Sequence, residues 1–177
     1  MAAQKRPEVE TTDFGVRINH IWNNETPPPM IRMAGGFTDK IDRWNLCDWH
    51  VRGNILRIDS GSMLPGTGGH TGDRVGAIQF RHASIQTPEI ENTTNYFFTH
   101  SHNFALDDDK ISDGIFDSVS VAFEEDRDII EAQQRIIDLD PTRPMVAAPF
   151  DGPLIHIRNK IDEIIEREQT SQKIAAE

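Results

Sequence analysis

Residues 95–139 read NYFFTHSHNFALDDDKISDGIFDSVSVAFEEDRDIIEAQQRIIDL, and the repeat of apolar side chains changes within this stretch. Over Asn95–Phe104 the repeat has a period of two, which is typical of a half-buried strand. One face of this strand carries Tyr96, Phe98, His100, His102 and Phe104. After Asp107–Asp109, whose acidic side chains suit a helix N-terminus, the period is helical from about Ile111 to Leu139. The stretch therefore predicts a strand followed by one long helix.

Three further strands are predicted upstream, at Phe14–Trp22, Asn54–Asp59 and Val75–Ala83. The glycine-rich run Pro65–Asp73 between the last two is predicted as a loop. A shorter helix is expected over Pro153–Glu168, with proline in its first turn. Antiparallel strands followed by a long helix indicate an α+β domain, in which a curved antiparallel sheet packs on the C-terminal helix.

Length, charge and cysteine content limit the class of protein. The 177 residues fit one domain, and the polar segments 1–12 and 169–177 are expected to be flexible tails. A formal net charge of −11 argues against nucleic acid as a partner. It also argues against anionic membranes, and no apolar run is long enough to span a bilayer. Cys47 is the only cysteine, so the chain has no intramolecular disulfide and a cytoplasmic location is expected.

Asp126 stands out on the predicted long helix because it lies in the middle of the apolar stripe. At about 100° per residue, the residues within about 60° of it are Ile115, Val119, Ala122, Phe123, Ile129, Ile130 and Ile137. Gln133 falls on the same stripe, whereas Glu124 and Asp128 point the other way. A carboxylate among apolar residues is costly unless it is paired, hydrogen-bonded or bound to a metal. Asp126 is therefore either a satisfied core acid or a functional carboxylate.

Several motifs follow one another along the chain. The most specific is Phe123-Glu124-Glu125-Asp126, which precedes Glu131-Ala132-Gln133-Gln134. The others are, in chain order, Val9-Glu10, Gly15-Val16-Arg17, Arg43-Trp44, Trp49, Ile58-Asp59, Gly61, Gly66-Thr67-Gly68, Thr87-Pro88-Glu89, Asn95-Tyr96-Phe97-Phe98 and Asn103-Phe104. Together they resemble the C-terminal catalytic domain of Rieske non-haem iron aromatic ring-hydroxylating oxygenases of the vanillate O-demethylase type. The resemblance covers nearly the whole chain.

The resemblance implies a helix-grip, START-like fold, with a substrate pocket between the long helix and the curved sheet. It implies that Asp126 is the carboxylate of a two-His-one-carboxylate site for Fe(II), which leaves positions open for dioxygen. The residues expected to line the pocket for a small aromatic substrate are Tyr96, Phe98, His100, His102 and Gln133. The family reaction is O-demethylation or hydroxylation of an aromatic acid with dioxygen.

Parts of the family's machinery have no counterpart in these residues. The family's two histidine ligands lie in an Asp-x-x-His-x-x-x-x-His run, which does not occur in this sequence. A Rieske 2Fe–2S cluster needs two cysteines and two histidines, whereas Cys47 is alone. We therefore expect residues 1–177 to be a single partial catalytic domain without the N-terminal Rieske domain, inactive alone. Its expected partners are that missing portion or a separate oxygenase subunit, and a reductase.

Two alternatives to a partial oxygenase stay open. A non-catalytic helix-grip module would bind a small hydrophobic or aromatic ligand without iron. A degenerate gene product would have no activity and no defined melting transition. The histidines at 20, 82, 100 and 102 could rebuild a metal site with Asp126, but lining a pocket or filling an ordinary structural position is favoured for them.

Overall fold

The computed structural model describes residues 6–146, 148 and 151–176. The chain divides into two compact units, which are Met1–Phe104 with Pro149–Glu177, and Ala105–Ala148. The first unit holds the sheet and two helices, and the second holds the long helix α2 (Asp109–Leu139). In the described part of the chain, no helix combines the length and the apolar character needed to cross a bilayer.

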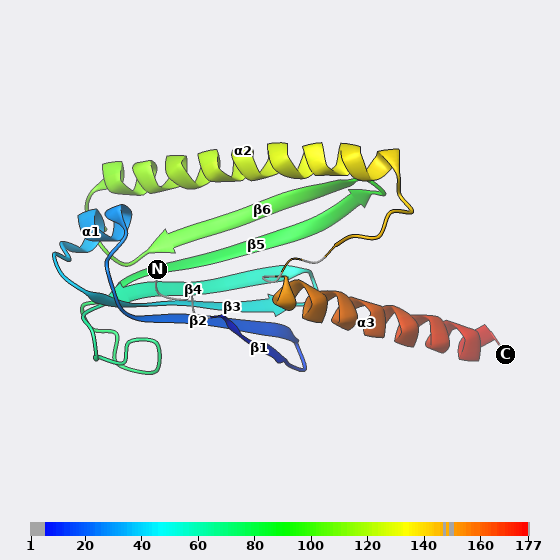
Figure 1. The fold of residues 1–177 in the computed structure, drawn as a ribbon, viewed down its shortest axis with the longest axis horizontal. Coiled ribbons are helices and arrows are strands. Elements are labelled where there is room, and N and C mark those ends of the chain that lie inside the picture. Colours follow the sequence, from blue (N-terminus) through cyan, green and yellow to red (C-terminus); the bar gives the residue numbers. More distant parts are fainter. Residues whose placement is uncertain (1–5, 147, 149–150, 177) are drawn as a thin grey trace. The chain divides into compact units, whose positions relative to one another are not determined.

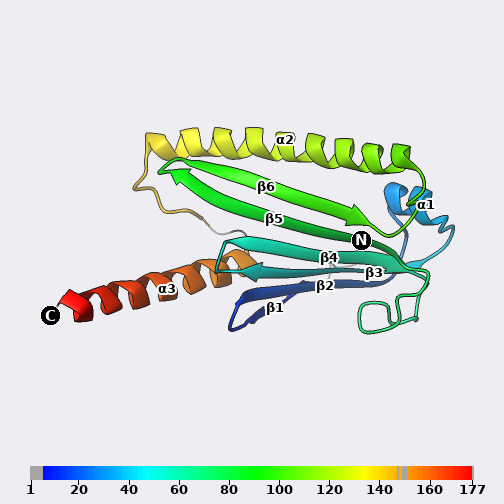
Figure 2. The ribbon, with the colours of Figure 1, turned by 180° about the vertical axis from the view of Figure 1, so that it is seen from behind.

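Six strands form one antiparallel sheet in the order β1-β2-β3-β4-β5-β6, so every strand pairs with its neighbour in the sequence (Figure 1). The strands are β1 (Glu8–Thr11), β2 (Gly15–Glu25), β3 (Ile41–His50), β4 (Ile55–Met63), β5 (Ile78–Ile90) and β6 (Thr93–His102). Short connections suffice between antiparallel neighbours. At the β3–β4 turn, Gly53 and Asn54 have φ angles of +85° and +48°. The result is a twisted meander, which both views show (Figures 1 and 2).

Alternation of side chains gives this sheet two chemically different faces. One face carries two adjacent rows of register partners: Arg17, Asp48, Arg57, Ala83 and Thr99, then Asn19, Leu46, Asp59, Arg81 and Ser101. We call it the arginine face. The opposite face carries the row Ile18, Cys47, Ile58, His82 and His100, with aromatic residues on either side of it along β5 and β6. We call it the aromatic face.

Trp44 is the largest fully buried side chain, with 1% of its surface exposed. It packs against Met63 and Ala77 at one end of the arginine face. Its register partner on β4 is Gly61, where a Cβ atom would lie only 2.1 Å from Cζ2 of the indole. Glycine is therefore required there by the close approach of the ring and not by the backbone angle.

Two helices complete the first unit. Helix α1 (Pro29–Gly35) connects β2 to β3 and starts with proline. It is capped by Gly36, whose φ of +64° suits a left-handed C-terminal cap. Helix α3 (Gly152–Ala176) contacts β1 and β2. Thr11 Oγ1 and His156 Nδ1 lie 3.4 Å apart between β1 and this helix.

Helix α2 has a clear start and stop. The Asp108 side chain accepts a hydrogen bond from the Lys110 backbone N–H at 3.1 Å, which satisfies one of the free donors at the N-terminus. The helix ends at Leu139, two residues before Pro141, as proline disfavours helical backbone in the residue before it.

We expect Asp108→Ala to destabilise α2 by about 1 kcal/mol, because alanine cannot accept the capping hydrogen bond. Far-UV circular dichroism during urea titration measures the loss. Asp107→Ala, which removes a neighbouring acid outside the helix, is the matched control. Equal losses in the two variants would contradict a capping role and indicate a general charge effect.

The α+β class, the glycine-rich loop and both predicted helices are confirmed. Three elements were not predicted: β1, α1 and most of β3. Sequence analysis expected flexible tails over 1–12 and 169–177, whereas the structure places Glu8–Thr11 in an edge strand and continues α3 to Ala176. The backbone of β1 is satisfied by its antiparallel pairing with β2, which side-chain polarity does not report.

Candidate functional site

The aromatic face carries a cluster of aromatic and imidazole rings along β5 and β6. The His100 ring centroid lies 5.3 Å from that of Phe80 and 5.5 Å from that of His82. Phe104 meets Phe80 edge-on at 5.4 Å. Ring pairs at these separations contribute stabilisation in addition to that from the burial of their surfaces. The cluster therefore offers flat apolar surfaces with imidazole nitrogens at their edges.

Four residues predicted to line a pocket lie on this face. They are Tyr96, Phe98, His100 and His102, whose partners on β5 are Gln86, Ser84, His82 and Phe80. Tyr96 is 44% exposed and the other three are half-buried. Asp126 and Gln133 lie on α2 in the second unit, and both are exposed. The structure thus brings four of the six predicted site residues together, and the roles of all six stay predictions.

His82 and His100 face each other across β5 and β6, with their Nδ1 atoms 3.3 Å apart. One ring must donate and the other accept, so at least one imidazole of the pair is neutral. Burial lowers the pKa of both rings, and the nearby His82 and His102 lower the pKa of His100 further. Sequence analysis counted His82 among the histidines that could line a pocket but did not pair it with His100; recognising the tight turn at Glu91-Asn92 would have done so.

We expect the folded chain to lose stability when the pH falls below about 6.5, the ordinary pKa of histidine. The pKa values of His82 and His100 are lower in the folded state, so the unfolded chain takes up protons first and acid favours unfolding. Above that pH both states are neutral at these rings and the effect vanishes. Urea unfolding at pH 5.5 and 7.5 measures the difference, which should be smaller in His100→Gln.

His70→Gln, in the loop between β4 and β5, is the control for this measurement. An equal reduction of the pH effect in both variants would show that the imidazole pair is not its source.

Three buried polar atoms on the aromatic face have no hydrogen-bond partner within the described ranges. They are His20 Nε2, Asn45 Oδ1 and Ser62 Oγ. His20 and Asn45 are register partners on β2 and β3, and Ser62 is fully buried. Buried polar atoms in native proteins are nearly always satisfied, so these three atoms set the aromatic face apart from an ordinary apolar core.

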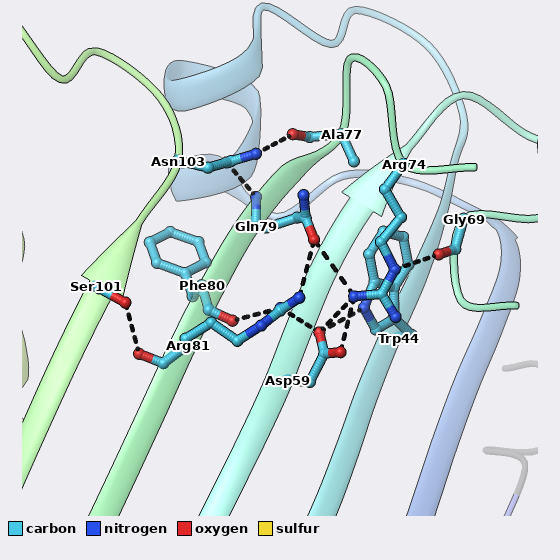
Figure 3. A network of polar contacts seen from close by, with 10 residues as sticks. All are labelled: Trp44, Asp59, Gly69, Arg74, Ala77, Gln79, Phe80, Arg81, Ser101 and Asn103. Carbon is cyan, nitrogen blue, oxygen red and sulfur yellow. Dashed lines mark hydrogen bonds and ion pairs between the residues drawn. The ribbon is translucent and has the colours of Figure 1, made fainter. Parts of the chain in front are cut away.

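The arginine face holds a network of polar contacts centred on Asp59 (Figure 3). Arg74 Nη1 donates to both carboxylate oxygens, at 3.0 and 2.7 Å, and Trp44 Nε1 donates to Oδ1 at 3.2 Å. Arg81 Nη1 forms a further ion pair with Oδ1. Gln79 Oε1 accepts from both arginines, at 3.3 and 3.2 Å. The network ties β3, β4 and β5 to the glycine-rich loop. Trp44 and Asp59 belong to motifs noted in the sequence, but their contact was not predicted.

An open groove of about 610 Å³ lies on the arginine face. Its charged lining includes Arg17, Asp48, Arg57, Asp59 and Arg81. Arg17 Nε donates to Asp48 Oδ1 at 2.8 Å, which closes one ion pair at its edge. None of the four predicted pocket residues on β6 lines this groove, because their side chains project from the opposite face.

The described residues do not by themselves form the iron site that the resemblance implies. Across residues 6–146, 148 and 151–176, no three His, Cys, Asp or Glu side chains are grouped so that they could hold a metal ion. Cys47 is no ready ligand or nucleophile, since burial raises the pKa of its thiol to about 11, with a further contribution from Asp48. Asp126 therefore offers at most one of three protein ligands.

Residues 1–167 match the sequence model of the vanillate O-demethylase oxygenase C-terminal domain. An iron–sulfur subunit attributed to the toluene-4-sulfonate monooxygenase system of Comamonas testosteroni is 42% identical over 171 residues, which cover 94% of this chain and 49% of the relative. Another iron–sulfur subunit of that system is 40% identical with the same coverage. A vanillate O-demethylase oxygenase subunit of Pseudomonas sp. (strain HR199 / DSM 7063) is 28% identical over 86% of this chain and 44% of its own.

The crystal structure of apo dicamba monooxygenase superposes with a TM-score of 0.76 at 23% identity, over 94% of this chain and 51% of the other. This similarity confirms the predicted helix-grip α+β fold. The chain spans about half the length of the curated relatives that it matches.

Proposed function

The chain belongs to the family of vanillate O-demethylase oxygenase C-terminal domains, and on this premise we propose that it is the C-terminal part of the oxygenase component of a Rieske-type aromatic oxygenase. The observation that carries the proposal is the match of the family model to 167 of the 177 residues. Its relatives are subunits or components of oxygenases named for toluene-4-sulfonate, vanillate and dicamba. The proposed substrate is accordingly a small aromatic acid, and the proposed location is the cytoplasm.

The aromatic face is the proposed wall of the substrate pocket. Its rings supply apolar surface to an aromatic substrate, and the imidazoles of His82 and His100, whose pKa values are lowered, are neutral at pH 7. A neutral imidazole can donate to a carboxylate or accept from a phenol.

Asp126 is the proposed carboxylate ligand of a mononuclear ferrous iron. When bound, such an iron supplies the activation of dioxygen beside the substrate. The described residues offer no second and third ligand in one group with it, so those ligands are proposed to come from another part of the oxygenase. Gln133 is two helical turns further along α2 and is proposed to present its amide on the same stripe.

Electrons are proposed to arrive from outside these residues. Relatives of this chain are named as components of multi-component systems, and they include iron–sulfur subunits. The single Cys47 cannot hold a Rieske cluster, so the cluster-bearing portion and a reductase are the proposed partners.

The proposal is tested by substrate turnover in the oxygenase that contains this chain. The oxygenase is supplied with a reductase and NADH and offered toluene-4-sulfonate, vanillate and dicamba in turn, and loss of each acid is followed by chromatography under ¹⁸O₂. We expect oxygen-dependent loss of at least one acid, with label in the product. No labelled product from any aromatic acid would contradict the proposed activity.

A second candidate function is a non-catalytic module that binds a small aromatic ligand. It is favoured by the aromatic face, which carries rings and unpartnered polar atoms within the first unit and needs no further chain. Calorimetric titration of residues 1–177 with aromatic acids in the presence of a chelator distinguishes the two functions. Tight binding with no turnover in the assembled oxygenase would support the module.

A further inference from the structure

The groove on the arginine face has a floor of small side chains between guanidinium groups. Ala83 and Thr99 are register partners, and Ser101 pairs with Arg81 in the adjacent row. Arg57 is the partner of Ala83 from the other side. Arg57 and Arg81 are thus diagonal neighbours, roughly 7–8 Å apart at the backbone. The small residues leave space between two long cationic side chains.

The carboxylates that line the groove are already engaged. Asp48 accepts from Arg17 at 2.8 and 3.4 Å. Asp59 is bound by Arg74, Arg81 and Trp44. The side chain of Arg57, by contrast, has no ion pair or hydrogen bond among the residues that the structure describes. A cation therefore remains uncompensated in the groove of a chain whose net charge is −11.

We propose that this groove binds the carboxylate of a small organic acid, seated over Ala83 between Arg57 and Arg81. The planar guanidinium of Arg57 presents parallel N–H donors that match the two oxygens of a carboxylate. Arg81 is half-exposed despite its pairing with Asp59, so part of its donor set still faces the groove. The hydroxyl group of Thr99, a lining residue, is a further donor, whereas the Ser101 hydroxyl already donates to the Arg81 carbonyl. The site lies on the opposite face from the aromatic cluster and involves no metal.

Titration of ¹⁵N-labelled chain 1–177 with benzoate, followed by amide NMR shifts, tests the proposal. We expect the shifts to concentrate on Arg57, Arg81, Ala83, Thr99 and Ser101. Benzamide, the neutral analogue, should leave these signals in place. Arg57→Gln should weaken benzoate binding at least about tenfold, the typical effect of losing a charge-assisted hydrogen bond. Arg57→Lys keeps the charge but not the planar fork, so its binding should be intermediate.

Arg52→Gln is the matched control, since Arg52 is exposed in the turn between β3 and β4 and lies outside the groove. Its affinity for benzoate should equal that of the unchanged chain. Unaltered affinity in Arg57→Gln, or equal shifts with benzamide, would overturn the site. Competition by sulfate at the concentration at which benzoate binds would overturn the assignment to an organic acid, because the groove would then be a general oxyanion site.

Discussion

Asp126→Asn is expected to remove the proposed mononuclear iron from the proposed oxygenase and to lower its turnover at least about 100-fold. Replacing even the outer partners of metal ligands typically costs roughly 10–100-fold. Asparagine keeps the size of the side chain but removes the negative charge that a ferrous ion requires from its carboxylate ligand. Iron content by elemental analysis and product by chromatography measure the two effects separately.

Asp128→Asn is the matched control on the same helix. Asp128 lies about 200° around α2 from Asp126, and its carboxylate accepts from Arg127 at 3.0 Å. This variant should keep both its iron and its turnover. Retention of iron by Asp126→Asn would show that Asp126 is a helix-surface acid and remove the basis of the proposed ligand. Circular dichroism of both variants checks that the helix is intact, so that a loss of iron can be separated from a loss of helicity.

Trp44→Ala is expected to destabilise the first unit by about 3–5 kcal/mol, the usual loss when a buried aromatic side chain is truncated in a core. The indole is almost completely buried, packs on Met63 and Ala77, and donates to Asp59. Its removal leaves a cavity and takes one donor from Asp59. Urea unfolding followed by circular dichroism gives the difference in the free energy of unfolding.

Gly61→Ala tests the same contact from the other strand. A methyl group there would lie 2.1 Å from the Trp44 ring, so the variant should lose about 1–3 kcal/mol, as overpacked cores do. In the Trp44→Ala background the clash is gone, and Gly61→Ala should be nearly neutral or stabilising. Strictly additive losses would contradict the contact. Trp22→Ala, which removes a half-exposed indole, is the control and should cost less.

The elements with a clean period could be predicted from sequence. Alternation over Asn95–Phe104 indicated β6 and the shared face of His100 and His102, and the helical period with acidic residues before it indicated α2 within two residues of its start. Strand β3 lacks such a signal, because Trp44 and Trp49 are separated by five positions and so point to opposite faces. In β1 only Val9 is apolar, so the strand depends on pairing with β2.

The same distinction, between what the period of apolar residues predicts and what it does not, applies to the candidate sites. Which residues share a face of one strand follows from the period, so the grouping of Tyr96, Phe98, His100 and His102 was correct. The period within one strand does not predict which strands are neighbours in the sheet, or in which register they pair. The contact between His82 and His100 and the network around Asp59 both depend on register, and the latter also on Arg74 of a loop.

The order of the strands has a consequence for how the polypeptide folds. Each strand pairs with the next one in the sequence, so every closure joins segments that are near one another along the chain. Closing a short loop loses less chain entropy than closing a long one. The sheet can grow hairpin by hairpin from β1 toward β6 as the polypeptide leaves the ribosome. All six strands precede α2 in the chain, so assembly of the sheet can begin before α2 has been completely synthesised.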